Sequence, residues 1–173
     1  MKKLLVSIVF TGILSSATYA QLQDQFRFSI NQLRIDTVEN FVRISMGECV
    51  RTYIVGAPEL PCVEVRYVIP FNKRVASITI TDSLSQSIRG SYLVYPSQPD
   101  FPTNEPPPAF VEPDSAIYAS DVSLPGLLVE LAGQYYEKGH HIVRLRIYPL
   151  AYKPLSLSLQ LYTSNGKKQK RYR

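Results

Sequence analysis

The chain has 173 residues, of which 45% are apolar and 19% are charged. These proportions exclude an intrinsically disordered protein and suffice for one domain with a buried core. The formal net charge is +5, but Lys2, Lys3 and five basic residues among the last seven supply more than that total. The body between the two ends is therefore slightly acidic, which argues against a nucleic-acid-binding domain.

The first twenty residues show the three parts of a secretory signal peptide. Two lysines precede an apolar run from Leu4 to Leu14, and a segment of small residues ends at Ala20. The apolar run is shorter than the roughly 20 residues that a membrane-spanning helix needs. We expect cleavage between Ala20 and Gln21 and an exported protein, either periplasmic or extracellular or at the cell surface, without a membrane span. A buried N-terminal strand or helix is the alternative.

Alternating apolar and polar side chains predict strands along most of the remaining chain. The expected strands cover residues 25–35, 41–45, 51–55, 63–69, 75–81 and 91–95, with a short one near 127–131. No segment has a helical periodicity strong enough to predict a helix.

The clearest alternation lies between residues 140 and 162. Val143, Leu145 and Ile147 fall on one face of a first strand. In a second strand, the residues expected to point inward are Leu155, Leu157, Leu159 and Leu161. Pro149 and Pro154 have no N–H to donate to a neighbouring strand, so we place them at strand ends. These features predict an antiparallel hairpin.

Seven prolines between residues 96 and 113 interrupt this pattern. Such a segment lacks hydrogen-bond donors and is expected to run extended over the surface. We interpret it as a crossover from one sheet to another, with a linker between two domains as the alternative. Most of residues 114–139 is expected to be irregular.

Cys49 and Cys62 are the only cysteines, and His140 and His141 are the only histidines. In an exported protein the two cysteines are as consistent with a disulfide as with two buried thiols. Adjacent histidines on a strand point to opposite faces and cannot bind one metal ion together. We therefore expect no catalytic residue, metal or cofactor, and we interpret the basic segment 166–173 as a solvated tail.

Three stretches, taken in order, carry a family resemblance. They are the turn 56–61 with the strand end 67–71, the segment 90–99, and residues 139–154 with a proline–tyrosine–proline corner. Together they resemble the N-terminal propeptide domain of gingipain-type cysteine peptidases of Bacteroidetes, over about residues 45–164. The residues that match the family's structural motifs are Gly56, Pro58, Leu60, Pro61, Pro70, Pro149, Tyr152 and Pro154.

The resemblance implies an all-β fold. The expected architecture is an antiparallel, jelly-roll-like β-sandwich of two sheets, with a proline-rich crossover. Together with the signal-peptide pattern and the basic C-terminal run, it divides the chain into a signal peptide (1–20), the propeptide-like domain (21–165) and a basic tail (166–173). Such domains precede a caspase-like catalytic domain, assist its folding and keep it latent.

The partner implied is the catalytic domain of a gingipain-type peptidase, reached in cis or, for a stand-alone domain, in trans. Because the sequence stops at Arg173, where that catalytic domain would begin, we expect no peptidase activity. The alternative function is a cell-surface adhesion or carbohydrate-binding sandwich, suggested by twelve tyrosines but weakened by the lack of tryptophan.

The signal peptide predicts the N-terminus of the exported protein. Edman sequencing or terminal-peptide mass spectrometry of the exported product should find Gln21 as its first residue. Recovery of the chain with Met1 intact would contradict both the cleavage and the expected export.

Overall fold

The computed structural model describes residues 4–12 and 20–163, and within them the fold is almost entirely antiparallel β-structure. A 3-10 helix (η1, Ile30–Gln32) and a short helix (α1, Ser115–Tyr118) complete it. The strands are β1 (Leu4–Gly12), β2 (Ala20–Phe26), β3 (Leu33–Val38), β4 (Phe41–Met46), β5 (Val50–Arg51), β6 (Pro61–Ile69), β7 (Lys73–Asp82), β8 (Leu84–Ile88), β9 (Val129–Glu137), β10 (His140–Ile147), β11 (Leu150–Lys153) and β12 (Ser158–Thr163).

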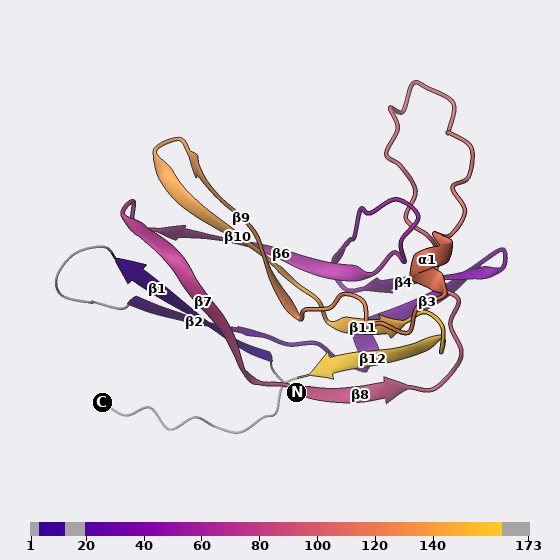
Figure 1. Ribbon diagram of the computed structural model, residues 1–173, viewed down its shortest axis with the longest axis horizontal. Coiled ribbons are helices and arrows are strands. Elements are labelled where there is room, and N and C mark those ends of the chain that lie inside the picture. The colour runs from indigo at the N-terminus through magenta and orange to yellow at the C-terminus, as the bar shows by residue number, and fades with distance from the viewer. Residues whose placement is uncertain (1–3, 13–19, 164–173) are drawn as a thin grey trace.

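In the described ranges the strands form four antiparallel sheets, ordered β2-β1-β7, β5-β6-β10-β9, β11-β12-β8 and β3-β4. Figure 1 shows β6, β9 and β10 in a layer that faces the sheet containing β1, β2 and β7. The core joins side chains from several sheets, among them Ile44 of β4, Leu145 of β10 and Leu161 of β12, all 0% exposed. The expected all-β antiparallel sandwich is therefore confirmed, although its strands are divided among more than two sheets.

Strand β10 follows the alternation that its sequence predicted. Val143, Leu145 and Ile147 are each 0% exposed, whereas Arg144 and Arg146 lie on the other face and are half-buried. The strand pairs with β6 on one side and β9 on the other, so it is an interior strand of its sheet.

The expected hairpin over residues 140–162 is wrong. β10 and β12 lie in different sheets, and β12 pairs instead with β11 and β8. Pro149 marks the corner where the chain leaves one sheet for the other. The sequence pattern missed β11 because its first three residues, Leu150 to Tyr152, are all buried and show no alternation.

The inward face of the second expected strand is correct only in part. Leu159 is 1% exposed and Leu161 is 0% exposed, but Leu155 is 63% exposed. Leu157 has a φ of +51° and lies in the turn between β11 and β12. The alternation of leucine and serine in the sequence therefore begins in the turn that precedes β12. In that turn the alternation does not indicate which side chains are buried.

Other strand boundaries also need correction. The expected strand 25–35 is interrupted by η1, whose cap is a local hydrogen-bond pair between Ser29 and Gln32. Of 51–55 only Arg51 belongs to a strand, and 91–95 forms one isolated bridge, between Val94 and Val42, rather than a strand. The strand expected at 127–131 begins at Val129 and reaches Glu137. Strand β8 and helix α1, which Asp114 caps, were not expected.

The proline-rich segment is a crossover between sheets, as expected. It connects β8, in the sheet β11-β12-β8, with β9, in the sheet β5-β6-β10-β9. Residues that precede this segment in the sequence, such as Ile44, and residues that follow it, such as Val143, belong to one buried cluster. In Figure 1 this segment is the long loop that projects from the body next to α1.

At the N-terminus, the apolar run of the expected signal peptide forms β1. This strand pairs with β2 and β7 and is the middle strand of their sheet, and Ala20 begins β2 opposite Phe10. Cleavage after Ala20 would remove β1, so the processed chain would lose the partner strand of both β2 and β7. That cleavage remains a prediction, and the basic tail 166–173 lies outside the described residues.

The buried and exposed leucines around β12 give a matched test of the core. Leu159→Ala should lower the free energy of unfolding by about 2–5 kcal/mol, because it leaves a cavity in the core. Leu155→Ala, at an exposed position, should change it by no more than about 0.5 kcal/mol. Chemical denaturation measures both. Equal losses would contradict the orientation of β12.

Candidate functional site

The turn of residues 56–61, here called the anchoring turn, binds two distant segments through backbone hydrogen bonds. Gly56 has a φ of +80°; its N–H donates to the carbonyl oxygen of Ser97 (2.9 Å), and its own carbonyl accepts from the N–H of Asp114 (3.0 Å). The N–H of Glu59 donates to the carbonyl of Tyr95 (2.9 Å). Residues 95–97 and 114 are the two ends of the projecting loop, so the turn fixes that loop at both ends.

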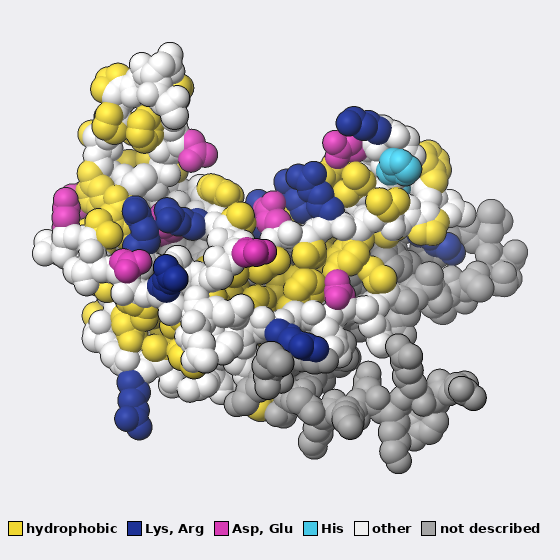
Figure 2. Space-filling model, turned by 180° about the vertical axis from the view of Figure 1, so that it is seen from behind, with side chains coloured by type: hydrophobic (Ala, Val, Ile, Leu, Met, Phe, Trp, Pro, Cys, Tyr) yellow, Lys and Arg dark blue, Asp and Glu magenta, His cyan; other side chains and the backbone are white. Residues whose placement is uncertain are grey.

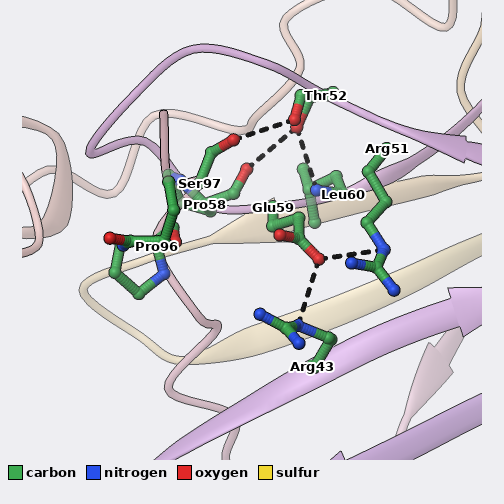
Figure 3. A network of polar contacts seen from close by, with 9 residues as sticks. Arg43, Arg51, Thr52, Pro58, Glu59, Leu60, Pro96 and Ser97 are labelled. Carbon is green, nitrogen blue, oxygen red and sulfur yellow. Dashed lines mark hydrogen bonds and ion pairs between the residues drawn. The ribbon is translucent and has the colours of Figure 1, made fainter. Parts of the chain in front are cut away.

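Thr52 holds the anchoring turn closed (Figure 3). Its hydroxyl donates to the carbonyl of Pro58 (3.2 Å) and accepts from the N–H of Leu60 (3.0 Å). Its backbone N–H donates to the carbonyl of Leu60, and its own carbonyl accepts from the hydroxyl of Ser97, both at 3.0 Å. Thr52 thus connects the anchoring turn, at Pro58 and Leu60, to Ser97 at the start of the loop.

A buried carboxylate lies at the centre of this network. Glu59 is 6% exposed, and its Oε1 lies 3.3 Å from Nε of Arg43 and 3.1 Å from Nε of Arg51. These are ion pairs without hydrogen-bond geometry, since Oε1 of Glu59 and Nε of Arg43 are buried with no hydrogen-bond partner. Burial raises the pKa of Glu59, and the positive charges of Arg51 and Arg43 oppose that rise.

The loop of residues 98–113, here called the anchored loop, is closed at its base and exposed beyond it. The side-chain amide of Gln98 donates to the carbonyl of Val111 (3.0 Å) and accepts from its N–H (2.8 Å). Phe110 packs on Phe41 and Tyr95, with ring centroids 6.0 and 5.7 Å away. Every residue from 100 to 110 is exposed. The chain therefore presents a long, proline-stiffened loop from a rigid base.

Tyr152 joins the same assembly from β11. It is 0% exposed, and its hydroxyl donates to the carbonyl of Tyr92 at 2.8 Å. Burial raises the pKa of its hydroxyl. Tyr118 of α1 similarly donates to the carbonyl of Val94 at 2.6 Å. Two tyrosines thus hold the segment that leads into the anchored loop.

The structure brings some of the sequence-predicted motif residues together and leaves others apart. Gly56, Pro58, Leu60 and Pro61 lie in the anchoring turn and are buried, and Tyr152 reaches the segment beside it. The remaining three occupy separate turns and corners, namely Pro70, Pro149 and Pro154. The sequence did not reveal the roles of Arg43 or Gln98, because their partners are distant in the chain.

The cysteines and histidines do not form a catalytic pair. His141 pairs with Ile69 and Cys62 lies seven residues earlier on the same strand β6, a separation of about 23 Å. Both thiols are free, and burial raises the pKa of Cys49 and of Cys62 to about 11. They are thus protonated near neutral pH and are poor nucleophiles. A disulfide between them remains a prediction; Val50, next to Cys49, pairs with Cys62 across β5 and β6.

Within residues 4–12 and 20–163, no three His, Cys, Asp or Glu side chains are grouped as metal ligands. The described ranges also contain no helix with the length and apolar character needed to cross a membrane. The fold and this site define an antiparallel β-domain whose distinctive feature is a loop held on a buried ionic and backbone network.

Comparisons with known proteins place this domain in a family. The sequence matches the profile of the Propeptide_C25 family over residues 12–165. The chain therefore belongs to the Propeptide_C25 family. No match was found among curated proteins.

Two solved structures share the fold. One concerns the zymogenic latency of gingipain K from Porphyromonas gingivalis, with 22% identity, a TM-score of 0.59 and coverage of 82% of each chain. The other is a complex of the RgpB pro- and mature domains from the same organism. It has 19% identity and a TM-score of 0.62, and the match covers 89% of this chain and 80% of that one.

The left-handed conformation of Gly56 gives one test of the anchoring turn. Gly56→Ala should cost about 1–2 kcal/mol, because residues with a Cβ are strained at this φ. Gly126→Ala is the matched control: a Cβ there would meet no atom within 4 Å, so a change of no more than about 0.5 kcal/mol is expected. Chemical denaturation measures the free energy of unfolding of both variants. Equal losses would contradict the expected backbone strain of alanine at position 56.

The raised pKa of Glu59 gives a second test, through pH. A carboxyl group whose pKa is higher in the folded state stabilises the fold at pH values below its unfolded pKa, and that stability is lost as pH rises through the folded pKa. Relative to Glu59→Gln, which cannot titrate, the wild type should therefore lose stability as the pH rises above the ordinary glutamate pKa of about 4.5 and through the raised pKa of the folded state. If the denaturation midpoint of the wild type rose instead over this range, the effect of Arg43 and Arg51 on the pKa of Glu59 would exceed the effect of burial.

Proposed function

We propose that this chain is an exported propeptide domain that binds the catalytic domain of a gingipain-type cysteine peptidase, assists its folding and keeps it latent. The observation that carries this proposal is the family match, which spans residues 12–165. The fold shared with a gingipain K structure concerned with zymogenic latency supports it. The partner is reached either in cis or in trans.

The anchored loop supplies a structural means for such binding. A loop that is ordered before binding loses little conformational entropy when it enters a cleft. Here both ends of the loop are fixed by the anchoring turn, and prolines at 102 and 106–108 restrict its backbone. Phe101 near its beginning is 47% exposed and available for contact. We assign this loop as the element that covers the peptidase cleft.

An inhibition assay tests the proposed function. The cognate catalytic domain is given a fluorogenic peptide, and the full chain is added in increasing concentration. The wild type should slow cleavage and should itself cleave nothing. A variant with residues 100–109 replaced by Gly-Ser-Gly keeps the Gln98–Val111 hydrogen bonds and should need at least about tenfold more protein for half inhibition.

Two outcomes would contradict the proposal. Turnover by the chain alone, abolished by Cys62→Ala, would make it an enzyme. Absence of any effect on the cognate peptidase, together with binding to carbohydrate, would favour the adhesion function instead.

A further inference from the structure

The outer face of the sheet β6-β10-β9 carries three rows of side chains that run across its strands. The strand register places Val68, Ile142 and Tyr135 in one row. The next row contains Arg66, Arg144 and Gly133, and the third contains Glu64, Arg146 and Glu130. An apolar row, a cationic row and a mixed-charge row therefore lie side by side on one face.

The two carboxylates of the third row have partners within the protein, although the row keeps one excess negative charge. Nε of Arg146 donates to Oε1 of Glu64 at 2.7 Å, and this hydrogen bond lowers the pKa of Glu64. The hydroxyl of Tyr148 donates to Glu130 at 2.6 Å. Both carboxylates of the row thus already have close partners.

The arginines of the middle row have no ion-pair partner of this kind. Arg66 and Arg144 are directly opposite each other across β6 and β10, a like-charge arrangement that disfavours folding. Neither forms an ion pair with any residue described in 4–12 or 20–163. Nε of Arg144 is buried and has no hydrogen-bond partner. The charges of Arg144 and Arg66 contribute to the lowered pKa of Glu64 in the next row, but Glu64 is ion-paired with Arg146 and with neither of them.

The space beside these arginines is open. Gly133 is the neighbour of Arg144 on β9, and a Cβ there would approach only Tyr135, at 4.0 Å. In the adjacent row Val68 is 68% exposed. Figure 2 shows Lys and Arg side chains, with Asp and Glu side chains beside them, in the hollow between the projecting loop and the hairpin of β9 and β10. A second chain can thus reach both the cations and the apolar row.

We infer that this face, here called the arginine face, is a docking surface for an acidic segment of the peptidase domain, in which carboxylates alternate with apolar side chains. The charge of Arg66 and Arg144 selects the carboxylates, and the row of Val68, Ile142 and Tyr135 selects the apolar groups beside them. Binding of carboxylates would relieve the like-charge contact between Arg66 and Arg144. The choice of the peptidase as partner rests on the proposed function.

The key variant is Arg66→Glu. It turns a like-charged pair into an oppositely charged pair, so the free domain should keep its fold and its thermal midpoint should not fall. At the same time it removes the net positive charge of the arginine face. Arg34→Glu is the matched control, because Arg34 is an exposed strand residue on β3, in another sheet.

The first experiment probes the surface without the peptidase. The full chain is titrated at low salt with a capped pentapeptide of alternating leucine and glutamate, and amide NMR shifts are recorded. The shifts should centre on Arg66, Gly133 and Arg144, weaken with salt, and vanish when glutamine replaces glutamate in the peptide. Absence of shifts on these residues would overturn the inference, as would self-association of the chain through this face.

The second experiment uses inhibition of the cognate peptidase. Arg66→Glu should raise the concentration for half inhibition by about tenfold, and Arg34→Glu by no more than about twofold. Inhibition unchanged by Arg66→Glu would overturn the inference but leave the proposed function intact. No inhibition by the wild type would contradict the proposed function and the peptidase as occupant, and the peptide titration would still decide whether the face binds acidic segments.

Discussion

The structure of the functional region depends on the backbone hydrogen bonds of the anchoring turn. Gly56 and Glu59 bind carbonyls at residues 97 and 95, and Asp114 donates back to Gly56. These bonds tie the start and the end of the anchored loop to one turn. Without them, the loop's many exposed residues would have a flexible base, and ordering the loop on a partner would cost more conformational entropy.

The side chains around the turn make this arrangement specific. Glu59 is placed between Arg43 and Arg51, and the Thr52 hydroxyl bonds Pro58 and Leu60 on either side of Glu59 in the turn. Buried polar groups of this kind are costly unless their partners are correctly positioned, so they favour one geometry over alternatives. Rigidity at the base of the loop and exposure at its tip are properties expected of a domain that covers a partner's cleft.

The features of the fold that depend on local periodicity could be predicted from the sequence. The all-β class, the inward face of β10 and the crossover at 96–113 followed from alternation and proline content. The pairing of β10 with β6 rather than with β12 did not, because partner choice depends on contacts between residues distant in the chain. The network at Glu59 was missed for the same reason: its arginines come from β4 and β5 and look like ordinary strand residues.

Amide hydrogen exchange of the full chain tests the anchoring most directly. The N–H groups of Gly56, Glu59, Ser97 and Asp114 are all hydrogen-bonded, so they should exchange as slowly as core amides such as that of Leu145. Amides between residues 100 and 110 should exchange much faster, because that part of the loop is exposed. Fast exchange at the four anchoring amides would contradict the account, since the loop would then have no rigid base.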